Sequence, residues 1–127
     1  MAAQAPSRAY QANAVVFTLL AAGHTFAGKS FTSDPQFKNL PRTVGAYARA
    51  GWYQGSVFFL IVALINYRWS RVPGALANPA EKAIAALISA LCWGSSAWYH
   101  RNGIRDTSAI VGFAGALQTW AAFFSRK

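Results

Sequence analysis

The stretch GWYQGSVFFLIVALINYRW, residues 51–69, decides how the rest of the chain is interpreted. No residue from Ala50 to Tyr67 carries a charge. A helix of that length covers about 27 Å, close to the thickness of the hydrocarbon core of a bilayer. Aromatic residues lie at both ends of the stretch and arginines lie just outside them, as in helices that end among lipid headgroups. The stretch therefore predicts a transmembrane helix.

Dividing the chain at its charged residues gives three further uncharged windows, at residues 9–28, 83–100 and 107–125. The surface helices of a soluble domain need a polar face along their length, which these windows lack. With 127 residues, the chain has room for one domain. We therefore expect an all-α fold, an integral membrane four-helix bundle in a single domain, residues 1–127, with spans at about 9–28, 50–67, 83–100 and 107–125.

The first window is the least apolar of the four because it contains Gln11, Asn13, Thr18 and His24. An apolar run after Arg8 and small residues near Ala27 also fit a cleaved signal peptide. Because polar residues interrupt the run, we expect a retained span. Asn66 and Gln118, in later windows, are interpreted as hydrogen-bonding residues between helices.

The longest connection, residues 29–49, has an amphipathic pattern. Apolar and basic residues fall on opposite faces: Phe37, Leu40, Val44 and Tyr47 against Lys38, Arg42 and Arg49. This pattern predicts a short helix lying in the membrane interface, with its regular part beginning near Pro41. An irregular basic loop is the alternative.

The net charge of +9 arises from basic residues placed between the apolar windows. Such a distribution argues against nucleic-acid binding, which needs a basic patch, and favours contact with anionic lipids. Basic residues are equally frequent on the two predicted sides, so the orientation stays open. The three acids are Asp34, Glu81 and Asp106. Each stands where it can cap a helix, with Glu81 reaching back towards Asn78.

Small residues recur every four positions in the last two windows and lead to a tryptophan in each: Ala86, Ala90, Gly94 and Trp98; Ser108, Gly112, Ala116 and Trp120. Such stripes allow close approach of helices in lipid. Packing within the bundle is the favoured interpretation, and a helix-packing oligomer is the alternative.

Four alternating spans place His24, Gln54, His100 and Thr107 at one side of the membrane, in the same layer as Trp52, Tyr53, Trp98 and Tyr99. The candidate catalytic residues are His24, His100 and Gln54. A neutral histidine can act as a general base, with Gln54 or Arg101 stabilising the resulting anion. In the structural alternative, His24 bonds a neighbouring helix and His100 lies at the water interface.

Metal binding is not expected. Two histidines without a nearby carboxylate or thiolate fall short of the three protein ligands of a catalytic zinc site. Haem ligation by His24 and His100 is a minor alternative. The single cysteine, Cys92, excludes an intramolecular disulfide. We therefore predict no cofactor.

The segments AGHTFAGKSF, ARAGWYQGSVFFLIVALINYRW and CWGSSAWY resemble those of small four-span membrane proteins of filamentous fungi, some encoded with aflatoxin-type polyketide mycotoxin pathways. The resemblance implies a multi-pass protein of the endoplasmic reticulum that supports secondary metabolism, binding a lipophilic intermediate or a pathway enzyme. No site residues come with it.

The chain also resembles the anthrone oxygenase family in its four spans and in the polar residues near one face. Members of that family are small membrane proteins that oxidise polycyclic phenols without an obvious cofactor. This resemblance implies the main alternative, a cofactor-independent membrane oxygenase or isomerase. A structural subunit of a membrane complex is the third possibility, so whether the protein is an enzyme stays open.

Overall fold

The computed structural model describes residues 7–125, which are helical with no strand, so the predicted all-α class is confirmed. The helices are α1 (Arg8–Ser33), α2 (Pro35–Lys38), α3 (Arg42–Arg71), α4 (Pro79–Arg101) and α5 (Arg105–Thr119). A 3-10 turn, η1 (Ala75–Ala77), precedes α4, and a π-helical turn, η2 (Trp120–Phe124), continues α5.

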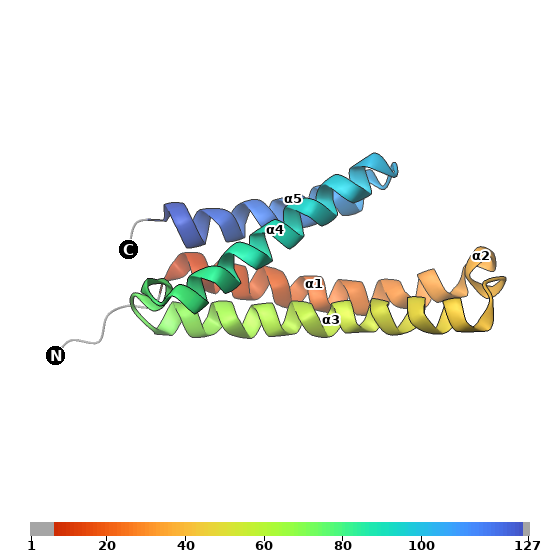
Figure 1. Cartoon of the computed structure of the whole chain (residues 1–127), viewed down its shortest axis with the longest axis horizontal. Helices are drawn as coiled ribbons and strands as arrows, with labels where there is room; N and C mark the ends of the chain where they lie inside the picture. The colour runs from red at the N-terminus through yellow and green to blue at the C-terminus, as the bar shows by residue number, and fades with distance from the viewer. Residues whose placement is uncertain (1–6, 126–127) are drawn as a thin grey trace.

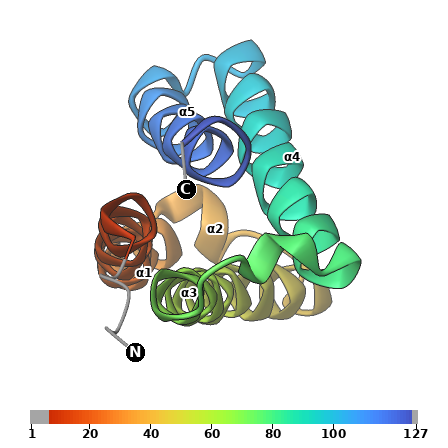
Figure 2. The ribbon, with the colours of Figure 1, turned by 90° about the vertical axis from the view of Figure 1, so that its left-hand side faces the viewer.

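The helices form two antiparallel hairpins. The first joins α1 to α3 through α2, and the second joins α4 to α5 (Figure 1). Packing is densest within each hairpin, and contact between the hairpins comes mainly from α1 with α5. Viewed from the end that carries the termini, the hairpins form two layers, with α4 sloping towards α3 (Figure 2). Away from this end the hairpins diverge (Figure 1).

Two helices among the described residues are long and apolar enough to cross a membrane: α3, and the segment Arg105–Phe124 formed by α5 and η2. The other two predicted spans lie in α1 and α4. Polar residues dilute α1, and small polar residues and tryptophans dilute the second half of α4. Two candidate crossings support association with a membrane, and the four-crossing bundle stays a prediction.

The connection between the first two predicted spans is more regular than the sequence indicates. α1 continues to Ser33, and α3 begins at Arg42, directly after Pro41, and runs without a break into the second span. The predicted start near Pro41 is confirmed. A separate interfacial helix is wrong for residues 42–49, which form the first turns of α3, whereas Phe37 and Lys38 lie in the four-residue helix α2. Asp34 caps α2 by accepting a hydrogen bond from the Gln36 amide, at 2.7 Å.

Glu81 has a structural role, but with partners other than the predicted ones. Asn78 caps α4 as predicted, accepting a hydrogen bond from the Ala80 amide at 2.9 Å. The Glu81 carboxylate instead pairs with Arg68 and accepts a hydrogen bond from the Trp69 indole at 2.8 Å. Hydrogen bonds from these two donors lower the pKa of Glu81. The pair ties the end of α3 to the start of α4.

Asp106 does not cap its helix. α5 begins after Ile104 without a side-chain cap, and Asp106 lies exposed in its first turn. α4 ends at Arg101, close to the end of the predicted span at residue 100, and Gly103 adopts a positive φ of 77° in the turn that follows.

Three fully buried amides hold the hairpins together. Asn13 in α1, Asn66 in α3 and Gln118 in α5 are each 0% exposed. Asn13 donates to the Oδ1 atom of Asn66 and to the Oε1 atom of Gln118, both at 3.2 Å, and Asn66 donates to the same Oε1 atom at 2.9 Å. The prediction that Asn66 and Gln118 bond between helices is confirmed. We call these three residues the amide triad.

The predicted packing of the small-residue stripes within the bundle is seen only in part: Ser108 and Gly112 of the α5 stripe contact α4, whereas the α4 stripe makes no such contact. The stripe on α4, from Ala86 to Trp98, is exposed. Ser96 and Ser108 instead exchange hydrogen bonds with each other's carbonyl oxygens, at 2.8 and 2.9 Å. Gly112 lies under the Ser96 hydroxyl, where an added Cβ would be 2.8 Å from Oγ. A four-residue step overshoots a helical turn by about 40°, so a strict stripe drifts off a straight contact line.

Candidate functional site

A cavity of about 850 Å³ lies between the two hairpins, on the side where they diverge. All four long helices contribute to its wall, which is mostly apolar and includes Leu20, Phe58, Phe59 and Phe113. No acidic side chain lines it. Cavities of this size and character are typical of sites for small lipophilic molecules.

His24, the first candidate catalytic residue, lies in the wall of this cavity and is half-buried. Its ring stacks on Trp52, with centroids 4.2 Å apart and planes at 11°, and meets the ring of Phe59 edge-on at 5.4 Å. The ring covers Gly55, where an added Cβ would be 3.1 Å from Cε1. These contacts hold the imidazole in one orientation.

The Trp52 ring of α3 covers a glycine of α1, just as the His24 ring of α1 covers a glycine of α3. The Trp52 indole covers Gly28 of α1, where an added Cβ would lie 2.8 Å from Nε1. The indole N–H donates to the carbonyl oxygen of His24 at 2.8 Å, and Phe31 stacks on its other face, with centroids 4.6 Å apart. Each helix thus supplies one aromatic ring and one glycine, so the position of His24 depends on Gly28 as well as on Gly55.

Ser56 also restrains the orientation of the His24 ring, through a hydrogen bond to Nδ1. Its Oγ atom lies 3.0 Å from Nδ1 of His24, and Ser56 is 5% exposed. If the hydroxyl donates, Nε2 carries the ring proton and is a donor; if Nδ1 donates, Nε2 is an acceptor. Among residues 7–125, Nε2 makes no hydrogen bond. His24 can therefore offer either role to a molecule in the cavity.

Two glycines keep the space beside His24 and Trp52 open. Gly23 precedes His24 and Gly51 precedes Trp52, and both line the cavity. A Cβ added at either position would meet no atom within 4 Å. Any larger side chain there would extend into the cavity or its mouth.

The structure brings together part of the predicted site. His24, Trp52, Tyr99 and Thr107 line the same cavity. Gln54 and His100 are exposed and do not line it, and the same is true of Tyr53 and Trp98. Gln54 lies on the outer face of α3, two residues from the buried Ser56. His100 is likewise separated by its exposed position from the cavity wall that holds His24, so no shared site of the two histidines is formed.

Sequence reasoning missed Ser56, Ser95 and the role of Gly55. The spacing of Gly51 and Gly55 was visible in the sequence as a helix-contact motif. It carried no information on which residue of α1 would face it. As for metals, no group of three His, Cys, Asp or Glu side chains within residues 7–125 could hold an ion.

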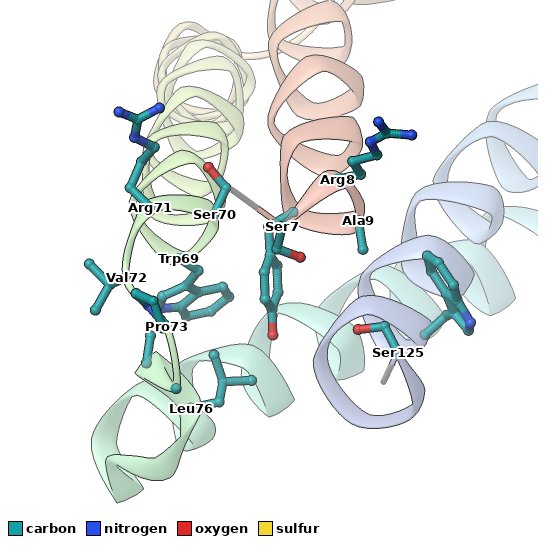
Figure 3. A pocket seen from close by; sticks show the side chains of 14 residues that line it. Ser7, Arg8, Ala9, Trp69, Ser70, Arg71, Val72, Pro73, Leu76 and Ser125 are labelled. Atoms are coloured by element: carbon teal, nitrogen blue, oxygen red, sulfur yellow. The ribbon is translucent and has the colours of Figure 1, made fainter. Parts of the chain in front are cut away.

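A smaller pocket of about 350 Å³ lies at the end of the molecule that carries the termini (Figure 3). Ser7, Trp69, Pro73 and Leu76 line it. Arg8 and Arg71 also line it, but their guanidinium groups point away from Trp69 and Leu76 (Figure 3). The cavity beside His24 is larger and contains the more strongly oriented polar group.

Comparison of the chain with protein family models, with curated proteins and with solved structures gave no match.

Proposed function

We propose that the protein is a multi-pass membrane protein that binds a lipophilic small molecule in the cavity between its hairpins, with His24 as the polar contact. One observation carries this proposal. An imidazole fixed by Ser56, Trp52 and Gly55 presents a free Nε2 atom on the wall of a large apolar cavity. A ligand that leaves the bilayer for the cavity loses little hydrophobic stabilisation and gains one oriented hydrogen bond.

The resemblance to fungal four-span proteins suggests a source for such a ligand. Polyketide intermediates are lipophilic and carry phenol or ketone groups. Within the proposal, the protein supports a biosynthetic pathway at the endoplasmic reticulum by holding one intermediate in the membrane.

A variant that fills the cavity tests the proposal. The probe is 4-hydroxystilbene, and binding is measured by its fluorescence with the purified protein in lipid nanodiscs. Gly23→Leu places a side chain in the open space beside His24, and we expect binding to weaken by about 1–3 kcal/mol. The matched control is Gly94→Leu, because Gly94 also has open space around it but lies on the outer face of α4.

The control variant should bind the probe as the unmodified protein does. Equal weakening by both substitutions, or none by either, would show that the probe does not occupy the cavity. His24→Phe, which keeps an aromatic ring over Gly55 and removes both nitrogens, should bind trans-stilbene normally and lose the preference for the phenol.

The enzyme alternative uses the same residue. The free Nε2 atom of His24 favours proton abstraction from a bound phenol or acidic carbon. The two groups expected to stabilise the resulting anion, Gln54 and Arg101, do not line the cavity. Since no cation and no acid lie in the wall, the geometry favours binding over catalysis.

A further inference from the structure

The wall of the cavity opposite His24 carries a second polar group. Ser95 and Tyr99 lie one turn apart on α4, and Thr107 lies in the first turn of α5. All three line the cavity and are half-buried. The Ile104 amide donates to the Tyr99 carbonyl at 3.0 Å, which folds the α4–α5 turn back and brings the start of α5 close to Tyr99. We call Ser95, Tyr99 and Thr107 the hydroxyl cluster of the second hairpin.

These hydroxyls differ from most others in the long helices. Most of the other serine and threonine side chains in these helices bond to a carbonyl about one turn earlier, as Ser89 does to Ala85 and Thr119 to Gly115. Within the described residues, no hydrogen bond is formed by the side chains of Ser95, Tyr99 or Thr107. None of the three is among the buried polar atoms without a partner, so these hydroxyls are accessible, and three such hydroxyls on one cavity wall can donate to or accept from a polar atom of a ligand.

We infer that the ligand has an apolar body with hydrogen-bonding groups at two opposite edges. His24 on the first hairpin binds one of these groups, and the hydroxyl cluster on the second hairpin binds the other. This inference rests on the proposed function and narrows its ligand class. A single-headed amphiphile, such as a fatty acid, would leave one polar wall unpaired. A ligand of the inferred class also bridges α1–α3 and α4–α5 where the hairpins otherwise diverge.

The test compares three probes with one carbon skeleton: trans-stilbene, 4-hydroxystilbene and 4,4′-dihydroxystilbene. The variant S95A/Y99F/T107V removes the three hydroxyls with little change in volume. We expect it to weaken binding of the dihydroxy probe by about threefold to tenfold, the loss of one hydrogen bond. Binding of 4-hydroxystilbene should change by no more than about twofold, because its one hydroxyl can still reach His24.

His24→Phe should weaken binding of both phenols, because it removes the group that binds the hydroxyl of 4-hydroxystilbene and one of the two groups that bind the dihydroxy probe. If the triple variant fails to fold, Thr107→Val alone tests the point, since valine keeps the shape of threonine. If the hydroxyl-removing variant affects both phenols equally, or affects neither, the two-edge inference is overturned while the proposed function stays intact. If neither phenol binds to the unmodified protein, the proposed function fails together with the inference.

Discussion

At the scale of single residues, buried polar groups determine how much stability a substitution removes. The amide triad is 0% exposed, and even in the intact protein Oδ1 of Asn13 and Nε2 of Gln118 have no partner among the described residues. If one partner is removed, the polar group left behind is buried without a hydrogen bond, and the protein loses stability by the free energy of desolvating that group. Replacing all the polar groups of the set by apolar ones can be nearly neutral.

Asn66→Leu should therefore destabilise the protein by about 1–3 kcal/mol, because Asn13 and Gln118 each lose a hydrogen-bond partner. Reversible unfolding in detergent measures the change. Gln54→Leu is the control, an exposed amide on the same helix. The triple variant N13L/N66L/Q118L should recover part of the loss, and a triple variant less stable than N66L would contradict this account.

Glu81 gives a second prediction, in pH dependence. Its pKa is lowered from the ordinary 4.5 by hydrogen bonds from Arg68 and Trp69. A carboxyl group whose pKa is lower in the folded state stabilises that state above the ordinary pKa and loses the contribution as the pH falls through the folded value. Glu81→Gln should therefore melt below the unmodified protein at neutral pH, and the difference should shrink below pH 4.5. An equal difference at all pH values would refute this origin, and Asp106→Asn, an exposed acid, is the control.

At the scale of the helix, glycine has two opposite uses in α1. Gly28 lies under the Trp52 indole, whereas Gly23 faces open space. We predict that Gly28→Ala destabilises the protein by about 1–3 kcal/mol through overpacking. Gly23→Ala should stabilise it by up to about 1 kcal/mol, because alanine loses less entropy in a helix. Thermal unfolding of the two variants would show opposite shifts, and shifts of the same sign would contradict the packing of Trp52 on Gly28.

The helices could be predicted from the sequence because uncharged windows and Pro, Gly and Asn signals act locally. Asn78 and Gly103 mark ends of α4 that the structure reproduces. Which face of each helix is buried could not be predicted, because the contacts depend on which other helix lies opposite that face. The α4 stripe ending at Trp98 is exposed for this reason. The candidate site could likewise be predicted only in part. His24 was identified as a polar residue in an apolar window, but its contacts with Ser56 and Gly55 come from α3 and depend on how α1 and α3 pack.

At the scale of the whole molecule, the first hairpin is longer than a bilayer is thick. α3 has 30 residues and covers about 45 Å, against a hydrocarbon core of about 30 Å. The excess lies towards α2, where Lys38, Arg42 and Arg49 are placed. In a membrane, this end of the hairpin would extend among or beyond the headgroups.

Cysteine labelling distinguishes four crossings from two. In a Cys92→Ala background, Lys38→Cys and Ala77→Cys report the two ends of α3. If α4 also crosses, Asn102→Cys is labelled by an impermeant maleimide from the same side as Lys38→Cys. If only α3 and the Arg105–Phe124 segment cross, position 102 is labelled with position 77, and the four-helix membrane bundle is wrong.

The amide triad also bears on the order in which the protein is made. Asn13 and Asn66 belong to the first hairpin and bond to each other directly, whereas Gln118 comes from the last helix. As the chain leaves the ribosome, the first two long helices can form the hydrogen bond between Asn13 and Asn66 before α5 exists. The Oε1 atom of Gln118 then accepts hydrogen bonds from two donors that are already in place, Nδ2 of Asn13 and Nδ2 of Asn66, so α5 completes the triad only in the register that brings Gln118 between them.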